Sequence, residues 1–153
     1  MKTLVTYFSA EGTTKKVAEE FAKSLGADVF EIVPEKPYTA ADLNWRNPLA
    51  RCNREFIGKK DVPARGRIEN LSEYDVVFIG FPIWYGSAPN VVNTFCGAHR
   101  WDGIRVHAFA TSGGSGIGRS AEKLAPFVKG AVSVDAVLVR TADDLAAWAG
   151  TLS

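Results

Sequence analysis

Residues 3–33, TLVTYFSAEGTTKKVAEEFAKSLGADVFEIV, contain the pattern that decides the fold class of this chain. Residues 3–8 are an apolar run typical of a buried strand, and residues 9–13 form a polar turn. The next apolar residues fall on one helical face: Val17, Ala18, Phe21, Ala22 and Leu25. Gly26 is a suitable helix stop, and residues 28–33 alternate like a second strand. This order predicts a strand–helix–strand unit of a parallel sheet.

The same alternation returns in the second half of the chain. Strands are expected at residues 75–80, at 104–111 and within 131–139. The apolar faces of three further helices are expected at Val91, Val92, Phe95 and Cys96 after Pro89; at Ile117, Ala121, Leu124 and Ala125 before Pro126; and at Leu145, Trp148, Ala149 and Leu152 after a Thr141–Asp144 capping box. Five strands alternating with helices predict an α/β three-layer domain with a five-stranded parallel sheet, and residues 1–153 fit a single domain.

Residues 34–74 interrupt this alternation and are called the excursion below. Four prolines divide the segment, and charged residues are dense in it. The Asn47-Pro48 pair is typical of a helix start, so a short helix is expected over roughly 48–57. Long connections in compact domains are often functional.

Composition excludes several classes of protein. Hydrophobic residues make up 46% and charged residues 23%, and the net charge of +1 argues against a nucleic-acid partner. No apolar run approaches the ~18 residues that span a bilayer, so no membrane association is expected. The first residues enter a strand pattern without an apolar signal region, which favours a cytoplasmic location. Cys52 and Cys96 are expected to be buried free thiols, and with His99 and His107 they make no metal-ligand pattern.

The loops after the first, third and fourth strands of such a sheet are the place to look for a ligand. Residues 9–15, SAEGTTK, offer three hydroxyls, a glycine and a helix N-terminus, which suit a phosphate. The loop contains neither a nucleotide-triphosphate nor a dinucleotide glycine motif. Residues 81–89, FPIWYGSAP, place two adjacent aromatics between a proline and a glycine, as expected for stacking on a flat ring. Residues 111–118, TSGGSGIG, leave backbone N–H groups accessible to a polar ligand edge.

Each loop alone has an ordinary alternative: a capped helix, an aromatic core or a flexible turn. Together they supply an anion site, an aromatic platform and a polar edge, which is what flavin mononucleotide (FMN) requires.

These loops resemble those of the short-chain flavodoxins, which carry Ser-x-Thr-Gly-Asn-Thr, Pro-Ile-Trp-Trp-Gly and Thr-Ser-Gly-Gly-Ser-Gly motifs. The resemblance covers nearly the whole chain and implies the strand order 2-1-3-4-5. It also implies three sets of FMN contacts: the phosphate with Ser9, Gly12, Thr13 and Thr14; the isoalloxazine with Pro82, Trp84, Tyr85 and Gly86; and its polar edge with Thr111, Ser112, Gly113 and Gly114. It further implies that backbone at Gly86 adjusts with the redox state of the flavin.

Two departures from the family pattern bear on function. Glu11 and Thr13 stand where the family has Thr and Asn. A carboxylate at about 5 Å from the phosphate would cost a few kcal/mol, so we expect the Glu11 side chain to point to solvent. The charge of the chain is balanced, whereas carrier flavodoxins are typically acidic.

Three functions remain open from the sequence. The first is an electron-transfer flavoprotein whose partners are redox proteins or a small electron acceptor. The second is an FMN-dependent NAD(P)H:quinone-type oxidoreductase, with a substrate pocket near Asn44, Trp45 and Arg46. The third is a non-redox binding module that has lost the flavin. A response-regulator receiver is disfavoured because Gly80-Phe81 and Ser9-Ala10 stand where its acidic residues would be.

Overall fold

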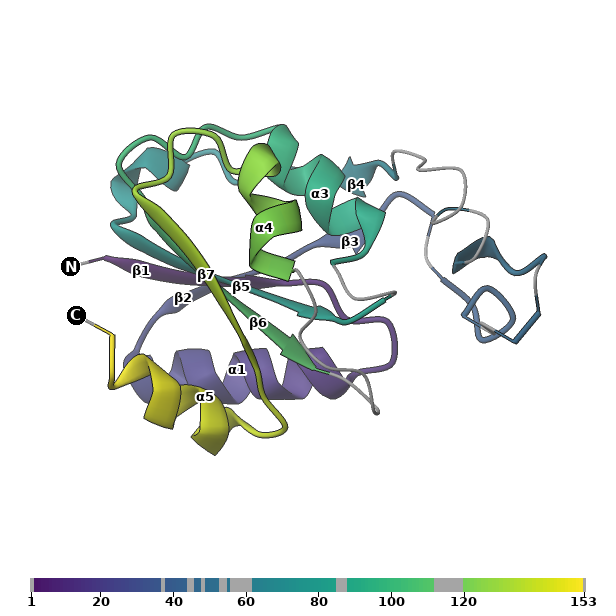
Figure 1. Ribbon diagram of the computed structural model, residues 1–153, viewed down its shortest axis with the longest axis horizontal. Coiled ribbons are helices and arrows are strands. Elements are labelled where there is room, and N and C mark those ends of the chain that lie inside the picture. The colour runs from purple at the N-terminus through teal and green to yellow at the C-terminus, as the bar shows by residue number, and fades with distance from the viewer. Residues whose placement is uncertain are drawn as a thin grey trace.

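A five-stranded parallel sheet forms the centre of the molecule (Figure 1). The computed structural model describes residues 2–36, 38–43, 46–47, 49–52, 55, 62–84, 88–111 and 120–152. The strands are β1 (Thr3–Tyr7), β2 (Asp28–Glu31), β5 (Val76–Pro82), β6 (Arg105–Thr111) and β7 (Ser133–Leu138). Their order is β2-β1-β5-β6-β7 and every neighbouring pair is parallel. In chain order this is the predicted 2-1-3-4-5 arrangement.

Helices cover both faces of the sheet, which confirms the three layers (Figure 1). One face carries α1 (Thr13–Leu25) and α5 (Ala142–Ala149), and the other carries α3 (Asn90–Gly97) and α4 (Ser120–Leu124). Each face has its own apolar cluster. Because both faces are covered, the central strands are almost continuously apolar and buried.

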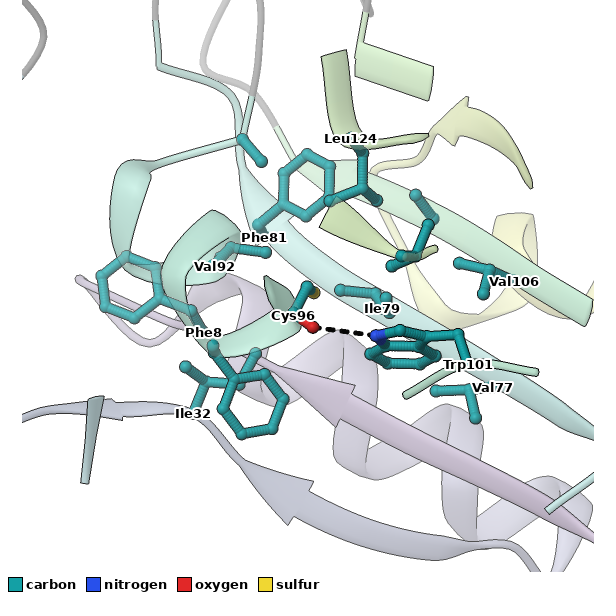
Figure 2. Close-up of a cluster of buried hydrophobic side chains, with 14 of the residues drawn as sticks. Phe8, Ile32, Val77, Ile79, Phe81, Val92, Cys96, Trp101, Val106 and Leu124 are labelled. Atoms are coloured by element: carbon teal, nitrogen blue, oxygen red, sulfur yellow. Dashed lines mark hydrogen bonds between the residues drawn. The ribbon is translucent and has the colours of Figure 1, made fainter. Parts of the chain in front are cut away.

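The core beneath α3 is closed by a buried tryptophan. Trp101 is fully buried, and its indole Nε1 donates a hydrogen bond of 2.9 Å to the carbonyl oxygen of Cys96 (Figure 2). Cys52 and Cys96 are buried free thiols, as the sequence predicted. Burial raises the pKa of Cys96 far above its ordinary value, so this thiol is inert.

The helix ends largely follow the sequence signals. Gly26 stops α1 with a φ of 66°, and Thr141 forms the predicted capping box with Asp144, whose backbone N–H donates to the Thr141 hydroxyl over 3.1 Å. The helix α4 gives way to a 3-10 turn that contains Pro126. Two expectations were wrong. Leu25 is 48% exposed, because it is the last residue of α1 and the helix has already left the core. Ala125 is exposed, because α4 ends at Leu124 and Ala125 opens the 3-10 turn.

Two strand boundaries also differ from the prediction. The run 28–33 is not one strand, because β2 ends at Glu31 and β3 (Val33–Pro34) leaves the main sheet. There it pairs antiparallel with β4 (Ala64–Arg65), so a small two-stranded sheet joins the start of the excursion to residues 64–65 within it. The third strand runs on to Pro82, which pairs with Thr111 of β6 and therefore belongs to the sheet and not to the loop.

The excursion extends beyond the carboxyl ends of the strands and is fastened to α3 (Figure 1). Asn47 accepts a hydrogen bond from the backbone N–H of Leu49 over 3.0 Å, as a helix cap would. Residues 51, 52 and 55 are helical, and the remainder of the predicted 48–57 helix lies outside the described residues. The Asn90 amide donates to the carbonyl oxygen of Glu55 over 3.0 Å, which joins the excursion to the start of α3.

No helix in the part of the chain that the structure describes is long and apolar enough to cross a membrane.

His99 gives the fold a defined pH dependence. Its Nε2 accepts the backbone N–H of Ile68 over 2.9 Å, so the ring is neutral and its Nδ1 donates to the Phe95 carbonyl oxygen over 2.7 Å. Burial lowers the pKa of His99 below 6.5; the contact with Phe95 partly opposes this, and Arg67 adds to it. The unfolded chain therefore binds a proton at this histidine more readily than the folded chain does. The contribution of neutral His99 to the free energy of unfolding is fully present above about pH 7 and is lost as the pH falls through 6.5 and below.

We therefore expect the urea midpoint of the parent chain to fall between pH 7.5 and pH 5.5 by more than that of His99→Gln, which retains an acceptor but does not titrate. Equal losses in the two proteins would show that His99 is not responsible.

Candidate functional site at the carboxyl ends of the strands

The loops singled out in the sequence start from neighbouring strands at one edge of the sheet. Tyr7 at the end of β1 pairs with Gly80 of β5, and Pro82 at the end of β5 pairs with Thr111 at the end of β6. The chain therefore leaves all three strands on the same side, where the excursion also lies (Figure 1).

The first turn of α1 is arranged to receive an anion. The helix begins at Thr13 behind Gly12, and none of the side chains that the structure describes caps its N-terminus. Its first turn contains no acidic residue, so none of its own side chains sets a carboxylate against its backbone N–H groups and the positive end of the helix dipole. Gly12 has a φ of 94°, a conformation that favours glycine, and a Cβ added there would meet no atom of the described residues within 4 Å.

Ser9 and Glu11 complete this loop. The Ser9 hydroxyl oxygen accepts the backbone N–H of Gly12 over 3.1 Å, which leaves the hydroxyl hydrogen to donate elsewhere. Glu11 is exposed, as expected from the cost of placing its carboxylate next to a phosphate. Thr13 is exposed as well. The residues present thus fit a phosphate by donor chemistry and by the space around Gly12.

Thr14 and Thr111 are brought together as a buried pair. Their hydroxyl oxygens are 2.8 Å apart, and the residues are 2% and 4% exposed. The resemblance assigned both to FMN, Thr14 to the phosphate and Thr111 to the polar edge. In the structure their side chains bond each other and join the start of α1 to the end of β6, with either hydroxyl able to be the donor. Thr14 therefore has its backbone N–H for a phosphate and, where Thr111 is the donor of the pair, its hydroxyl hydrogen as well.

Breaking this pair should be measurable. Thr14→Val removes one partner and leaves the Thr111 hydroxyl buried without it, which we expect to cost about 1–3 kcal/mol in the free energy of unfolding. Adding Thr111→Val removes the orphaned hydroxyl, so the double variant should be more stable than the sum of the two single losses predicts. Denaturant titrations of the four proteins measure this, and simple additivity would contradict a bonded pair.

Trp84 lies two residues beyond the end of β5 and is half buried. It meets the Phe8 ring edge-on at a centroid distance of 5.8 Å and the Tyr38 ring edge-on at 5.2 Å. Behind it, the backbone N–H of Ile83 donates to the carbonyl oxygen of Thr111 over 2.9 Å, which fixes where the chain leaves the sheet. Trp84 is thus one member of an aromatic group drawn from three segments of the chain.

The sequence missed Tyr38, which the excursion brings to Trp84. Its hydroxyl donates to Glu55, and the Arg51 guanidinium lies over its ring at 4.0 Å. Arg51 and Glu55 also form an ion pair of 2.7 Å. Their spacing of four residues on the expected 48–57 helix was the available signal, but nothing in the sequence tied that pair to Tyr38.

Several predicted residues lie outside the described part of the chain: Tyr85, Gly86, Ser112, Gly113 and Gly114 among the FMN contacts, and Asn44 and Trp45 in the substrate pocket. Arg46 is exposed. For the described residues, the structure brings Ser9, Gly12, Thr13 and Thr14 to one end of the site, and Pro82 and Thr111 to adjacent strand ends.

A parallel sheet in this order, with an uncapped helix start after its first strand and a tryptophan after its third, defines a flavodoxin-like α/β domain. A family model described as Flavodoxin matches residues 2–152. The chain therefore belongs to the flavodoxin family. No curated protein sequence matches it.

Solved structures agree with this assignment. A candidate flavoprotein from Bacteroides eggerthii is 41% identical, with a TM-score of 0.89, and the match covers 97% of this chain and 96% of that one. A candidate flavoprotein from Bacteroides uniformis is 35% identical over 98% of each chain, with a TM-score of 0.86. A flavoprotein from Lactobacillus acidophilus, solved in complex with FMN, shares the fold at 23% identity and a TM-score of 0.72, over 97% of this chain and 98% of that one.

Proposed function

We propose that this chain binds one FMN non-covalently at the carboxyl ends of β1, β5 and β6 and uses it to transfer electrons. The observation that carries the proposal is the open first turn of α1 behind Gly12, which contains no acidic residue and is capped by no side chain among the described residues. Membership of the flavodoxin family supports the cofactor, as does the FMN complex of the Lactobacillus acidophilus protein.

Different residues of the chain bind different parts of FMN. Backbone N–H groups of the first α1 turn hold the phosphate, and the Ser9 hydroxyl donates to it. Trp84 flanks the isoalloxazine, and the braced Thr14–Thr111 pair holds the phosphate end and the ring end of the site at a fixed separation. Bound FMN supplies the redox chemistry, while the protein supplies position and electrostatics.

A role as an electron carrier fits best, because transferring electrons between partners requires no general acid or base from the protein. A second candidate is an FMN-dependent NAD(P)H:quinone-type oxidoreductase. Two observations favour it: the excursion reaches the site through Tyr38, and the chain has 18 basic against 17 acidic residues, without the acidity that steers carriers to basic partners.

Titration of the apo-protein with FMN and with riboflavin tests the site. Hydrogen bonds to a charged group contribute about 1.5–3 kcal/mol each. Riboflavin lacks the phosphate and loses these bonds, so it should bind roughly 100-fold more weakly than FMN or weaker still. Equal affinity for the two flavins would show that the protein does not bind the phosphate.

Anaerobic mixing of the FMN-loaded protein with NADH or NADPH separates the two functions. A carrier should be reduced by dithionite but should keep its visible bands in the presence of either nucleotide. Rapid bleaching by a nucleotide, followed by re-oxidation with a quinone, would instead support the oxidoreductase.

A further inference from the structure

Tyr38 occupies a special position in the excursion, because it joins a charged cluster to the aromatic side chains of the site. Its ring lies 5.2 Å from the ring of Trp84, nearly perpendicular to it, and 5.8 Å from that of Phe8. Phe8 is the residue after β1; it is fully buried, and its ring also meets the Trp84 ring edge-on. Trp84 is therefore held from two directions, by the sheet through Phe8 and by the excursion through Tyr38.

Two charged residues fix the Tyr38 ring in place. Glu55 accepts a hydrogen bond from the hydroxyl, while the Arg51 guanidinium covers one face of the ring at 4.0 Å. The Arg51 and Glu55 side chains are only 12% and 13% exposed and pair at 2.7 Å, so this ion pair is little screened by solvent. Arg51 also donates to the carbonyl oxygen of Lys36 over 2.7 Å, two residues before the tyrosine.

The phenol stays protonated and remains a donor. Burial raises the pKa of Tyr38 far above its ordinary value, and the Glu55 carboxylate raises it further, while Arg51 partly opposes them. The hydroxyl is thus committed to Glu55 at every physiological pH, which leaves the ring edge as the surface that Tyr38 presents to Trp84.

We propose that Tyr38, clamped by Arg51 and Glu55, is a positioning residue that sets the orientation of Trp84 against the flavin, so that the excursion determines the flavin environment. This inference rests on the proposed FMN site. It gives the excursion a role in cofactor binding in addition to that of the three strand-end loops.

A double-mutant cycle tests the inference. Tyr38→Leu removes the ring, and we expect it to weaken FMN binding about three- to tenfold, the range of one aromatic pair. In a Trp84→Leu background the same change should matter less than about twofold, because Tyr38 acts through Trp84. Tyr38→Phe retains the ring edge and should restore most of the affinity.

A matched control lies at the opposite edge of the sheet. Tyr74 precedes β5, donates to the Asp28 carboxylate over 2.6 Å and lies under the Lys2 ammonium at 4.8 Å. It therefore repeats the tyrosine, carboxylate and cation arrangement away from the site. Tyr74→Leu should leave FMN affinity within about twofold in both backgrounds, even if it destabilises the fold.

Two readouts separate the possible failures. If the parent chain takes up no FMN, the proposed function fails. The near-ultraviolet circular dichroism of the apo-proteins still tests the inference. The band that disappears in Trp84→Leu belongs to Trp84, and Tyr38→Leu should lose the same band because Trp84 is then no longer held in one orientation. If the parent binds FMN, equal weakening by Tyr38→Leu in both backgrounds would overturn it, as would an unchanged tryptophan band.

Discussion

Gly80→Ala should destabilise the protein by about 3 kcal/mol, at the upper end of what overpacking a core costs. Gly80 is in β5 directly beneath the Phe109 ring of β6, and a methyl group added there would overlap that ring. Phe109 is fully buried and packs edge-on against Phe21 of α1, so it has no room to move away. The measurement is the free energy of unfolding from urea titration.

Gly97→Ala is the matched control, because among the described residues its added methyl group would meet the Phe127 side chain alone, at an ordinary contact distance of 3.6 Å. Because Gly97 is an exposed residue of α3 and alanine favours a helix over glycine, the change should leave stability as it is or raise it by up to about 1 kcal/mol. Gly80→Ala combined with Phe109→Leu should recover part of the loss, because the smaller side chain makes room. If Gly80→Ala were as harmless as Gly97→Ala, the close approach of β5 to the Phe109 ring would be wrong.

Thr13→Asp should have opposite effects on the fold and on the cofactor. An acidic residue in the first turn of α1 complements the helix dipole, so apo-protein stability should rise by about 0.3–1 kcal/mol. The same carboxylate would lie next to the FMN phosphate. At about 5 Å and an effective dielectric of about 20 the repulsion is about 3 kcal/mol, which predicts a loss of FMN affinity on the order of 100-fold.

Thr13→Asn is the neutral control of nearly the same shape, and it should bind FMN within a few-fold of the parent. Riboflavin affinity should be unchanged in both variants, since riboflavin carries no phosphate. Fluorescence titration of each apo-protein with both flavins measures these effects. An Asp variant that is more stable and still binds FMN as tightly as the parent would mean that the phosphate lies elsewhere.

The parts of the fold that depend on local pattern could be predicted from the sequence. Apolar runs located the five strands, the spacing of Thr141 and Asp144 located a helix start, and Gly26 located a helix end. The strand order came from family resemblance, because alternation alone does not distinguish the ways of ordering parallel strands. The β3–β4 pair escaped prediction because it joins short segments that lie about thirty residues apart and includes a proline, which local pattern disfavours in strands.

The sequence singled out candidate loops but not the contacts that their side chains make. Thr14 and Thr111 belong to two of these candidate loops, yet their mutual bond spans 97 residues of sequence and only the folded sheet creates it. Tyr38 reads as one aromatic in a proline-rich segment, and its importance comes from contacts with Arg51, Glu55 and Trp84 that tertiary structure alone brings together.

The visible spectrum of the purified protein, recorded after incubation with FMN and passage through a gel-filtration column, tests the central claim most directly. We predict flavin absorbance bands that travel with the protein at a ratio of about one FMN per chain, and no comparable retention of riboflavin. A colourless protein fraction, with all the FMN eluting later as free cofactor at micromolar concentration, would contradict the claim that this chain is an FMN-binding flavodoxin-family protein.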